Sequence, residues 1–257
     1  MKTKNIFIVI LIVLVASSLY IWRSAKKKTA DVTPLSETII VGTNAEYPPF
    51  TFIKDNQITG FDIDVVQEAF RRINKKITIK DMSFKALIPS IQLGQIQVIA
   101  AGMTATPERA KHVLFTKPYI VGDRLLIVNL AKDSPIESVK DLSDKKVIVD
   151  EGYTADLYMS KIKGPILQRL SSPAQSFLAL QSGRAQAYVI AESSARLFFE
   201  KYGEKNFHHI PIEGTEETYS LVISKKYPKI LDRIQEALDE MEQDGTLQKL
   251  KVKWNLK

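Results

Sequence analysis

The sequence predicts an α/β fold made of two similar units. Short apolar runs of strand length alternate with longer segments whose apolar residues follow helical spacing, and this order predicts a parallel sheet with helices on its faces. The same pattern starts again after Gly122. A length of 257 residues, with 45% hydrophobic and 25% charged residues, is enough for two modest domains.

The first unit contains alternating elements, each ended by a turn or a glycine. An amphipathic helix is predicted from Asp62, because its apolar residues recur three or four positions apart, and the next helix stops at Gly94. In chain order the predicted elements are strand 39–41, an extended loop at 47–50, a turn at 55–57, helix 62–73, strand 77–79, helix 84–94 and strand 98–100.

The second unit repeats this order, and the chain then returns to the first. The predicted elements are strand 125–128, a helical turn at 139–142, strand 147–149, helix 154–161, helix 175–182, strand 187–190, helix 193–202, strand 219–223 and helix 230–241. His208 and His209 are expected in a solvated loop, since they lack further ligands at metal spacing, and Trp254 is expected to anchor the last helix.

The N-terminus has the pattern of an export signal. Lys2 and Lys4 precede an apolar run from Ile6 to Trp22, and a basic segment follows at 23–28. The run is short for a membrane span, and the stronger positive charge after it disfavours a stable anchor, so a cleaved signal at 1–28 is expected, with an uncleaved anchor as the alternative. No cysteine follows the run, which excludes a lipid-modified cysteine anchor.

The basic net charge of +7 belongs mostly to this leader. Residues 1–28 carry six of the 36 Lys and Arg residues and none of the 29 Asp and Glu residues, which leaves a net charge of +1 for the rest. The composition therefore gives no reason to expect nucleic-acid binding. No cofactor motif, metal-binding motif, nucleophile elbow, phosphate loop or cysteine nucleophile is present, so neither a cofactor nor a metal is expected.

A short helix after the strand at 98–100 carries a candidate anion receptor. Thr106 is a good N-cap, Pro107 suits the first helical position, and Glu108 favours the helix dipole. Arg109 opposes that dipole, which is tolerable if its guanidinium binds an anion with two hydrogen bonds; a surface salt bridge is the alternative.

Five segments together resemble one protein family. They are 42–50 (GTNAEYPPF), 60–65 (GFDIDV), 101–104 (AGMT) with 106–109 (TPER), 115–119 (FTKPY) and 147–154 (VIVDEGYT). In this order they resemble the family 3 extracellular solute-binding proteins of bacterial ABC importers, which bind polar amino acids. The resemblance covers about residues 37–257 and includes Asp244–Leu247 and Lys253–Trp254 near the end.

The resemblance implies a two-lobed periplasmic-binding-protein fold of type II that closes on one free amino acid by hinge motion. Residues 29–36 would be a linker, 37–121 and 217–257 lobe 1, and 122–216 lobe 2, with hinge crossings near Val121–Gly122 and Glu217–Thr218. It also implies a periplasmic or extracytoplasmic location, a membrane permease as partner, and a monomer. Closure requires a ligand that contacts both lobes.

The resemblance also assigns roles to individual residues. Arg109 would hold the ligand α-carboxylate with the Thr104 hydroxyl and backbone amides near Gly102 and Thr154, and Tyr153 and Ala101 line the same site. The ligand ammonium would meet an acid at the end of strand 187–190; strict spacing gives Ala191 there, and Glu192, the next residue, is the expected partner. Side-chain specificity would come from Asn44, Tyr47, Phe84 and Asp150.

Aromatic faces at Tyr47 and Phe84 favour a planar cationic side chain, and L-arginine is the first expectation. Asn44 stands where relatives that bind basic amino acids often have an acid, so Glu46, Asp150 or Glu151 would supply the charge. Glutamine or another polar amino acid is an alternative ligand. An exported dehydratase of the cyclohexadienyl or arogenate type, with Glu46 or Asp150 as general acid, is the alternative function.

Overall fold

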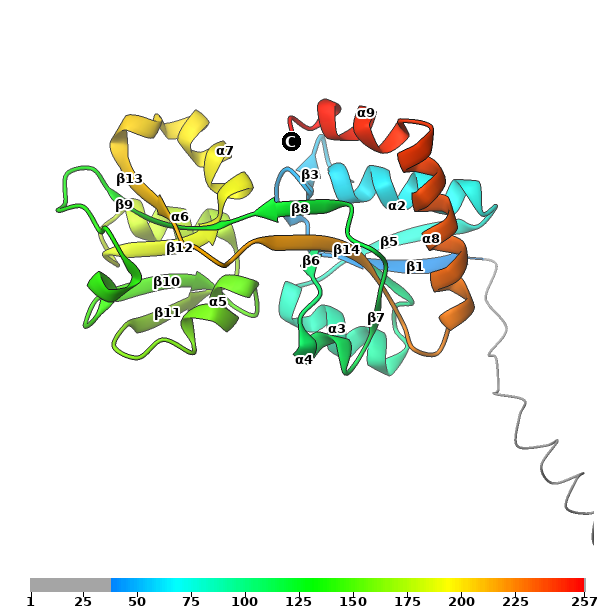
Figure 1. Cartoon of the computed structure of the whole chain (residues 1–257), viewed down its shortest axis with the longest axis horizontal. Helices are drawn as coiled ribbons and strands as arrows, with labels where there is room; N and C mark the ends of the chain where they lie inside the picture. The colour runs from blue at the N-terminus through cyan, green and yellow to red at the C-terminus, as the bar shows by residue number, and fades with distance from the viewer. Residues whose placement is uncertain (1–37, 257) are drawn as a thin grey trace, which may run out of the picture. The chain divides into compact units, whose positions relative to one another are not determined.

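The structure is a computed structural model and describes residues 38–256. Two sheets form within this part of the chain, together with a three-stranded hairpin sheet (Figure 1). The predicted signal at 1–28 and the linker at 29–36 lie outside the described residues. Within residues 38–256, no helix is both long and apolar enough to cross a membrane.

The first sheet is mainly parallel at its centre. β1 pairs in parallel with β5 and β6, and β14 closes the sheet in the antiparallel direction against β6. Its strand order is β5 (Lys76–Asp81), β1 (Thr38–Thr43), β6 (Val98–Thr104), β14 (Glu217–Ile223) and β7 (Leu114–Phe115). The predicted strand–helix alternation therefore produces a parallel sheet core.

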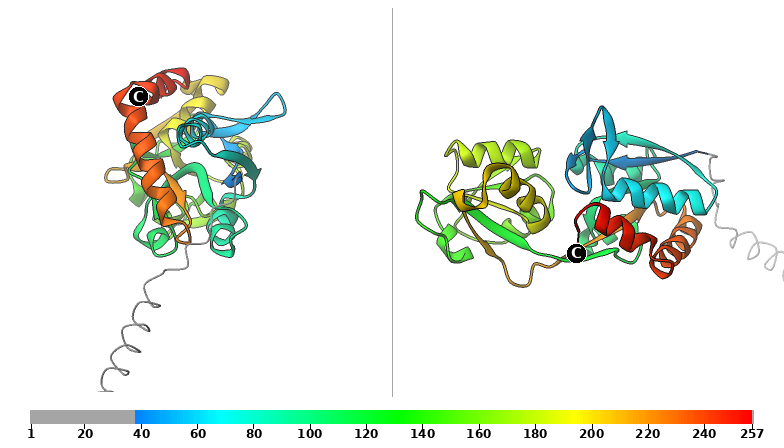
Figure 2. Two further views of the ribbon diagram at one scale, coloured as in Figure 1. Left: turned by 90° about the vertical axis from the view of Figure 1, so that its right-hand side faces the viewer. Right: turned by 90° about the horizontal axis from the view of Figure 1, so that it is seen from above.

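Helices and one hairpin flank this sheet. α2 buries Ile63, Val66 and Phe70 along one face, as its periodicity predicts, and it packs against α8, which lies next to α9 (Figure 2). The elements are β2 (Glu46–Tyr47), β3 (Thr51–Lys54), β4 (Gln57–Thr59), α2 (Phe61–Arg72), α3 (Phe84–Leu93), α4 (Pro107–Ala110), α8 (Pro228–Gln243) and α9 (Thr246–Lys253).

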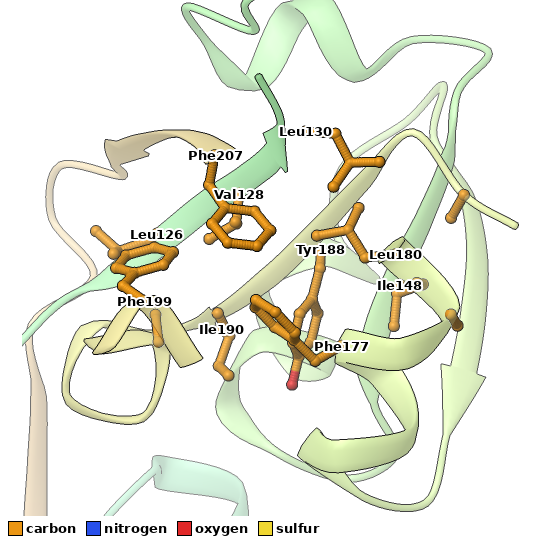
Figure 3. Packing of buried hydrophobic residues seen from close by; sticks show 13 residues of the cluster. Leu126, Val128, Leu130, Ile148, Phe177, Leu180, Tyr188, Ile190, Phe199 and Phe207 are labelled. Carbon is orange, nitrogen blue, oxygen red and sulfur yellow. The ribbon is translucent and has the colours of Figure 1, made fainter. Parts of the chain in front are cut away.

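The second sheet has the order β11 (Ile166–Leu170), β10 (Lys146–Asp150), β12 (Ala187–Ala191), β9 (Leu125–Leu130) and β13 (Phe207–Pro211). Its helical elements are η1 (Val139–Leu142), α5 (Thr154–Met159), α6 (Pro173–Gln181), α7 (Glu192–Tyr202) and η2 (Glu204–Asn206). Phe177, Tyr188, Phe199 and Phe207 gather in its core between the sheet and α6 and α7 (Figure 3).

Two strands connect the sheets and pair with each other. β8 (Ile120–Asp123) leads into β9, and β14 follows β13; β8 and β14 run antiparallel, with Glu217 opposite Asp123 and Thr218 opposite Val121 (Figure 1). These strands contain the positions at which hinge crossings were expected. The lobe boundaries derived from them remain a prediction.

Two strands of the second sheet were not predicted. β11 is an edge strand with no regular alternation of buried residues, so its sequence carries no period-2 signal. β13 contains His208 and His209, and the expectation of a solvated loop there was wrong because both residues pair with β9. The histidines and Pro211 hide the strand pattern, and β13 tolerates a proline because it lies at the sheet edge.

Trp254 follows α9 and is half-buried rather than deep in a core. Its ring lies edge-on to Phe52, with centroids 5.7 Å apart, and its Nε1 donates to Asp64 Oδ2 at 2.6 Å. Asp64 also forms an ion pair with Lys253 at 2.7 Å. The end of α9 is therefore fixed to the start of α2 by both polar and aromatic contacts.

Candidate functional site

The predicted site residues come from the ends of strands in both sheets. Asn44 follows β1, Tyr47 ends β2, Phe84 begins α3, Thr104 ends β6, and Tyr153 follows β10 just before α5. Ligands of open α/β sheets bind beyond the carboxyl ends of strands, so this location matches the general rule. Contacts among these residues join the two sheets.

Arg109 lies at the centre of the contacts. Thr106 caps α4 by accepting the Arg109 backbone N–H at 3.2 Å, as the sequence predicts. The guanidinium donates from Nη1 to the Thr104 carbonyl at 2.8 Å and from Nη2 to the Gly152 carbonyl at 2.9 Å, and it lies 5.3 Å over the Phe84 ring. The side chain therefore bridges β6 and the loop that follows β10.

Burial sets the electrostatics of Arg109. The residue is 6% exposed, and burial lowers the pKa of its guanidinium to about 10, while the negative charge of Glu217 opposes that shift. Arg109 remains a cation at neutral pH. Its hydrogen-bond partners are neutral carbonyl groups, so a negatively charged ligand would gain charge-assisted hydrogen bonds here.

Asp62 positions the end of β6. Its Oδ2 accepts the Gly102 backbone N–H at 2.5 Å, and burial raises the pKa of Asp62 to about 7 against the opposing effect of that hydrogen bond. Gly102 has φ 57°, and a Cβ there would lie 2.9 Å from Tyr47 Cε1, so only glycine suits this position. Ala101, next to Gly102, is buried in β6.

Three aromatic rings and one amide form the second part of the site. Tyr153 stacks on Phe84 with centroids 4.1 Å apart and contacts Tyr47 at 5.3 Å. Its hydroxyl donates to Asn44 Oδ1 at 2.6 Å, and Asn44 Nδ2 donates to the Met82 carbonyl at 3.2 Å. The four predicted specificity and loop residues Asn44, Tyr47, Phe84 and Tyr153 therefore form one contiguous cluster.

Asp150 lies behind this cluster. Ser176 donates to its Oδ1 at 2.6 Å, and the Tyr188 hydroxyl donates to its Oδ2. Burial raises the pKa of Asp150 to about 7, the two hydroxyl donors oppose this, and the charge of Glu46 adds to it. Glu46 itself is exposed on β2, and both acids act electrostatically on Tyr153.

Three residues of the crossing strands, which the sequence did not single out as site residues, lie beside this cluster. Glu217 and Asp123 are acidic residues on the paired strands β14 and β8, and the Tyr219 hydroxyl contacts both, at 3.2 Å and 2.7 Å. Tyr219 also meets the Tyr47 hydroxyl at 3.1 Å. The sequence did contain a signal for the two acids, because each lies at or next to an expected crossing. Strands that cross between two sheets border any cleft between those sheets, so acids on them are candidate site residues.

Glu192 and Thr154 occupy different surroundings. The Glu192 carboxylate pairs with Arg196 one turn along α7, and its backbone N–H donates to the Arg124 carbonyl at 2.8 Å. Thr154 begins α5 and forms a side-chain hydrogen bond with Glu217. Of the two residues, only Thr154 joins the Arg109 side of the site, and the predicted contact of Glu192 with a ligand stays a prediction.

The two sheets, the paired crossing strands and a buried cation between strand ends define a two-lobed binding-protein fold. Comparison with protein families gives a matching result. Residues 39–257 match the model for bacterial extracellular solute-binding proteins, family 3, and the chain belongs to this family. The fold class predicted from the sequence is thereby confirmed, and the family description assigns its members an extracellular location.

Named relatives agree with this membership. The arginine-binding extracellular protein ArtP of Bacillus subtilis (strain 168) is 32% identical over 222 residues, which cover 84% of this chain and 85% of that protein. An ancestral arginine-binding protein solved with arginine is 33% identical with a TM-score of 0.81, covering 86% of this chain and 99% of that one, and it was also solved with glutamine.

A third similar structure is relevant to catalysis. It is the ancestral amino-acid-binding protein AncCDT-1, described as a precursor of cyclohexadienyl dehydratase, which is 31% identical with a TM-score of 0.76. The match covers 85% of this chain and 95% of that one. This fold therefore includes a binding protein in the ancestry of an enzyme.

Proposed function

We propose that this protein is the extracytoplasmic substrate-binding component of an amino-acid ABC importer, and that it binds a free polar amino acid without changing it. The observation that carries the proposal is the buried Arg109 guanidinium, which reaches from β6 to the Gly152 carbonyl across the two sheets. A ligand α-carboxylate at this position would contact both sides and would favour the closed form.

We propose L-arginine as the ligand. Tyr47 and Phe84 provide aromatic faces on which a planar guanidinium can stack in place of the Tyr153 ring, which contacts both. Asp150 and Glu46 place negative charge beside Tyr153, which compensates for the neutral Asn44. The names of ArtP and of the ancestral arginine-binding protein support the same ligand, and the glutamine complex of the latter makes glutamine the second candidate.

The remaining parts of the proposal concern assembly and location. A membrane permease would receive the ligand from a monomeric binding protein, whose lobes would be residues 37–121 with 217–257 and residues 122–216. Residues 1–28 would direct export and would be removed, or would hold the protein at the membrane if they stay uncleaved. Mass spectrometry of the mature N-terminus in a bacterial host distinguishes the two cases.

Calorimetric titration of the full chain with each of the twenty amino acids tests the function. We expect L-arginine, or another basic amino acid, to bind most tightly. Strongest binding of glutamine would change the ligand but keep the function. Binding of none of the twenty would refute the proposal.

Arg109→Ala tests the carboxylate receptor. We expect this variant to lose binding of every amino acid that the wild type binds, because the α-carboxylate is common to all of them. Arg184→Ala is the matched control, since Arg184 is exposed on the loop before β12. Affinity close to wild type in Arg109→Ala would mean that the carboxylate binds elsewhere.

The dehydratase alternative rests on AncCDT-1 and on the buried acids of the site, whose raised pKa values near 7 suit a general acid. Incubation of the protein with prephenate and arogenate, followed by chromatography, tests it. We expect both compounds to be recovered unchanged.

A further inference from the structure

The ligand ammonium needs an acidic partner, and the position where the family resemblance expects one holds Ala191. This residue ends β12 and is buried. The neighbouring Glu192 has Arg196 as an ion-pair partner on α7. With Glu192 paired to Arg196, recognition of a free amino acid, which is the proposed function on which this inference rests, favours an acid from another element.

Glu217 is a buried acid in the site that forms no ion pair within residues 38–256. It begins β14 and is 5% exposed. Its carboxylate accepts a hydrogen bond from the Thr104 hydroxyl at 3.3 Å and contacts the Tyr219 hydroxyl at 3.2 Å. The Thr154 side chain also forms a hydrogen bond with this carboxylate. The hydrogen-bond partners of Glu217 are hydroxyl groups, and the nearby Arg109 guanidinium acts on it electrostatically without forming an ion pair with it.

Thr104 links Glu217 to Arg109. The Thr104 carbonyl accepts from the Arg109 guanidinium at 2.8 Å, while its hydroxyl donates to Glu217. A buried cation and a buried anion thus flank one residue without forming an ion pair with each other. The charged groups of an α-amino acid, a carboxylate and an ammonium on neighbouring atoms, have the matching arrangement.

We propose that Glu217 is the receptor for the ligand α-ammonium group, and that Arg109 and Glu217 together recognise the zwitterion. An ammonium beside Glu217 would give this carboxylate an ion-pair partner, as the α-carboxylate would give one to Arg109. Both residues belong to the first sheet and its adjoining helix α4.

Asp123 has a different part in this arrangement. Its carboxylate accepts the backbone N–H of Ser193 at 3.0 Å, the Ser193 hydroxyl and the Tyr219 hydroxyl at 2.7 Å. Because Tyr219 has one hydroxyl proton and lies closer to Asp123, that proton is donated there. Asp123 is thus a positioning residue that holds the start of α7 and the Tyr219 ring, and the Glu217 carboxylate keeps capacity for an ammonium.

Calorimetric titration of Glu217→Gln with a pair of ligands tests the proposal. The pair is the amino acid that the wild type binds most tightly and its deamino analogue; for L-arginine the analogue is 5-guanidinopentanoic acid. We expect the substitution to weaken binding of the amino acid about 30-fold or more, since it removes one partner of a buried charge pair. Affinity for the analogue, which has no ammonium, should change less than about 3-fold.

The analogue also reports on folding, because its binding by Glu217→Gln requires an intact site. Glu216→Gln is the matched control, since Glu216 is the exposed neighbour of Glu217, and it should bind both ligands as the wild type does. Glu192→Gln tests the competing acid. Equal losses for both ligands in Glu217→Gln, no loss for either, or a selective loss in Glu192→Gln instead would overturn the proposal.

Failure of the proposed function gives a separate result. In that case the wild type itself would bind no amino acid, and Glu217 would have no ammonium to recognise. Binding by the wild type with no selective loss in Glu217→Gln would reject only the assignment of Glu217.

Discussion

Tyr153 competes with the ligand side chain for the aromatic part of the site. Its ring contacts both Phe84 and Tyr47, the two rings between which the ligand side chain is expected to lie, and its hydroxyl donates to Asn44 Oδ1 at 2.6 Å. A ligand stacked on Phe84 therefore has to displace the Tyr153 ring. These contacts stabilise the arrangement in which Tyr153 lies against both rings, so they would lower the affinity for a ligand side chain that takes its place.

Tyr153→Phe removes the hydroxyl and keeps the ring. The lost buried hydrogen bond contributes about 1 kcal/mol net to the arrangement in which Tyr153 lies between the two rings, so the substitution should tighten L-arginine binding about 5-fold. Tyr153→Ala also removes the stacked pair, which contributes roughly 0.5–1.5 kcal/mol more, and should tighten binding about 30-fold in total.

Isothermal titration of L-arginine into the wild type and both variants measures these changes. Tyr158→Phe is the matched control, because Tyr158 is a half-buried tyrosine on α5, a few residues away. Unchanged or weaker binding in Tyr153→Phe would refute the reasoning. It would show that the Tyr153 hydroxyl contributes equally or more to the complex and that the ring stays in place as part of the binding surface.

Three further predictions concern the anion receptor, the second core and pH. Arg109→Lys keeps the charge but loses the two-pronged geometry, so titration should show at least about 10-fold weaker binding of every amino acid that binds. Phe177→Ala should lower the free energy of unfolding by about 3–5 kcal/mol in urea, because Phe177 is 1% exposed and packs on Phe198 and Phe207. Asp62 has a pKa near 7 in the folded protein and about 3.9 unfolded, so the folded state binds the extra proton between these values. Stability should therefore fall from pH 4 to pH 7, by up to roughly 4 kcal/mol from this group, and urea unfolding of Asp62→Asn should show a smaller fall.

Local sequence signals predicted most of the first sheet and its helices. The helix at Phe61–Arg72 follows from apolar spacing, and the end of α3 follows from Gly94, which has φ 81°. The start of α4 follows from Thr106 and Pro107, which the structure contains as N-cap and first residue. These features depend on neighbours within one helical turn, and sequence carries such information directly.

The strands that were missed depend on distant partners. β11 and β13 form the two edges of the second sheet, and their exposed faces impose little pattern on their sequences. Pairing with β10 and β9 decides their conformation, through backbone hydrogen bonds that any residue except proline can donate. No window of the sequence contains both partners, so local periodicity could not predict these strands.

The residues of the candidate site also differ in whether local sequence or distant partners determine their roles. Arg109 was predicted because an arginine in the first turn of a helix opposes the dipole and needs a specific reason. The direction of a carboxylate is harder to predict, because it depends on which donors the fold brings to it. Asp150 turns to Ser176 and Tyr188, Asp62 turns to Gly102, and the pairing of β14 with β6, in which Tyr219 lies opposite Thr104, brings Glu217 next to Thr104.

Because the fold decides which groups a carboxylate faces, the spacing of a family pattern selected Glu192 from the sequence alone. The pattern assumes that the ammonium partner stays at one position after β12, and it then selects the nearest acid in sequence. A ligand ammonium can pair with any acid that lies close to it in the folded protein, including an acid from another strand. With Ala191 at the expected position and a buried acid on the crossing strand that forms no ion pair within residues 38–256, the fold offers a candidate partner that the linear spacing did not contain.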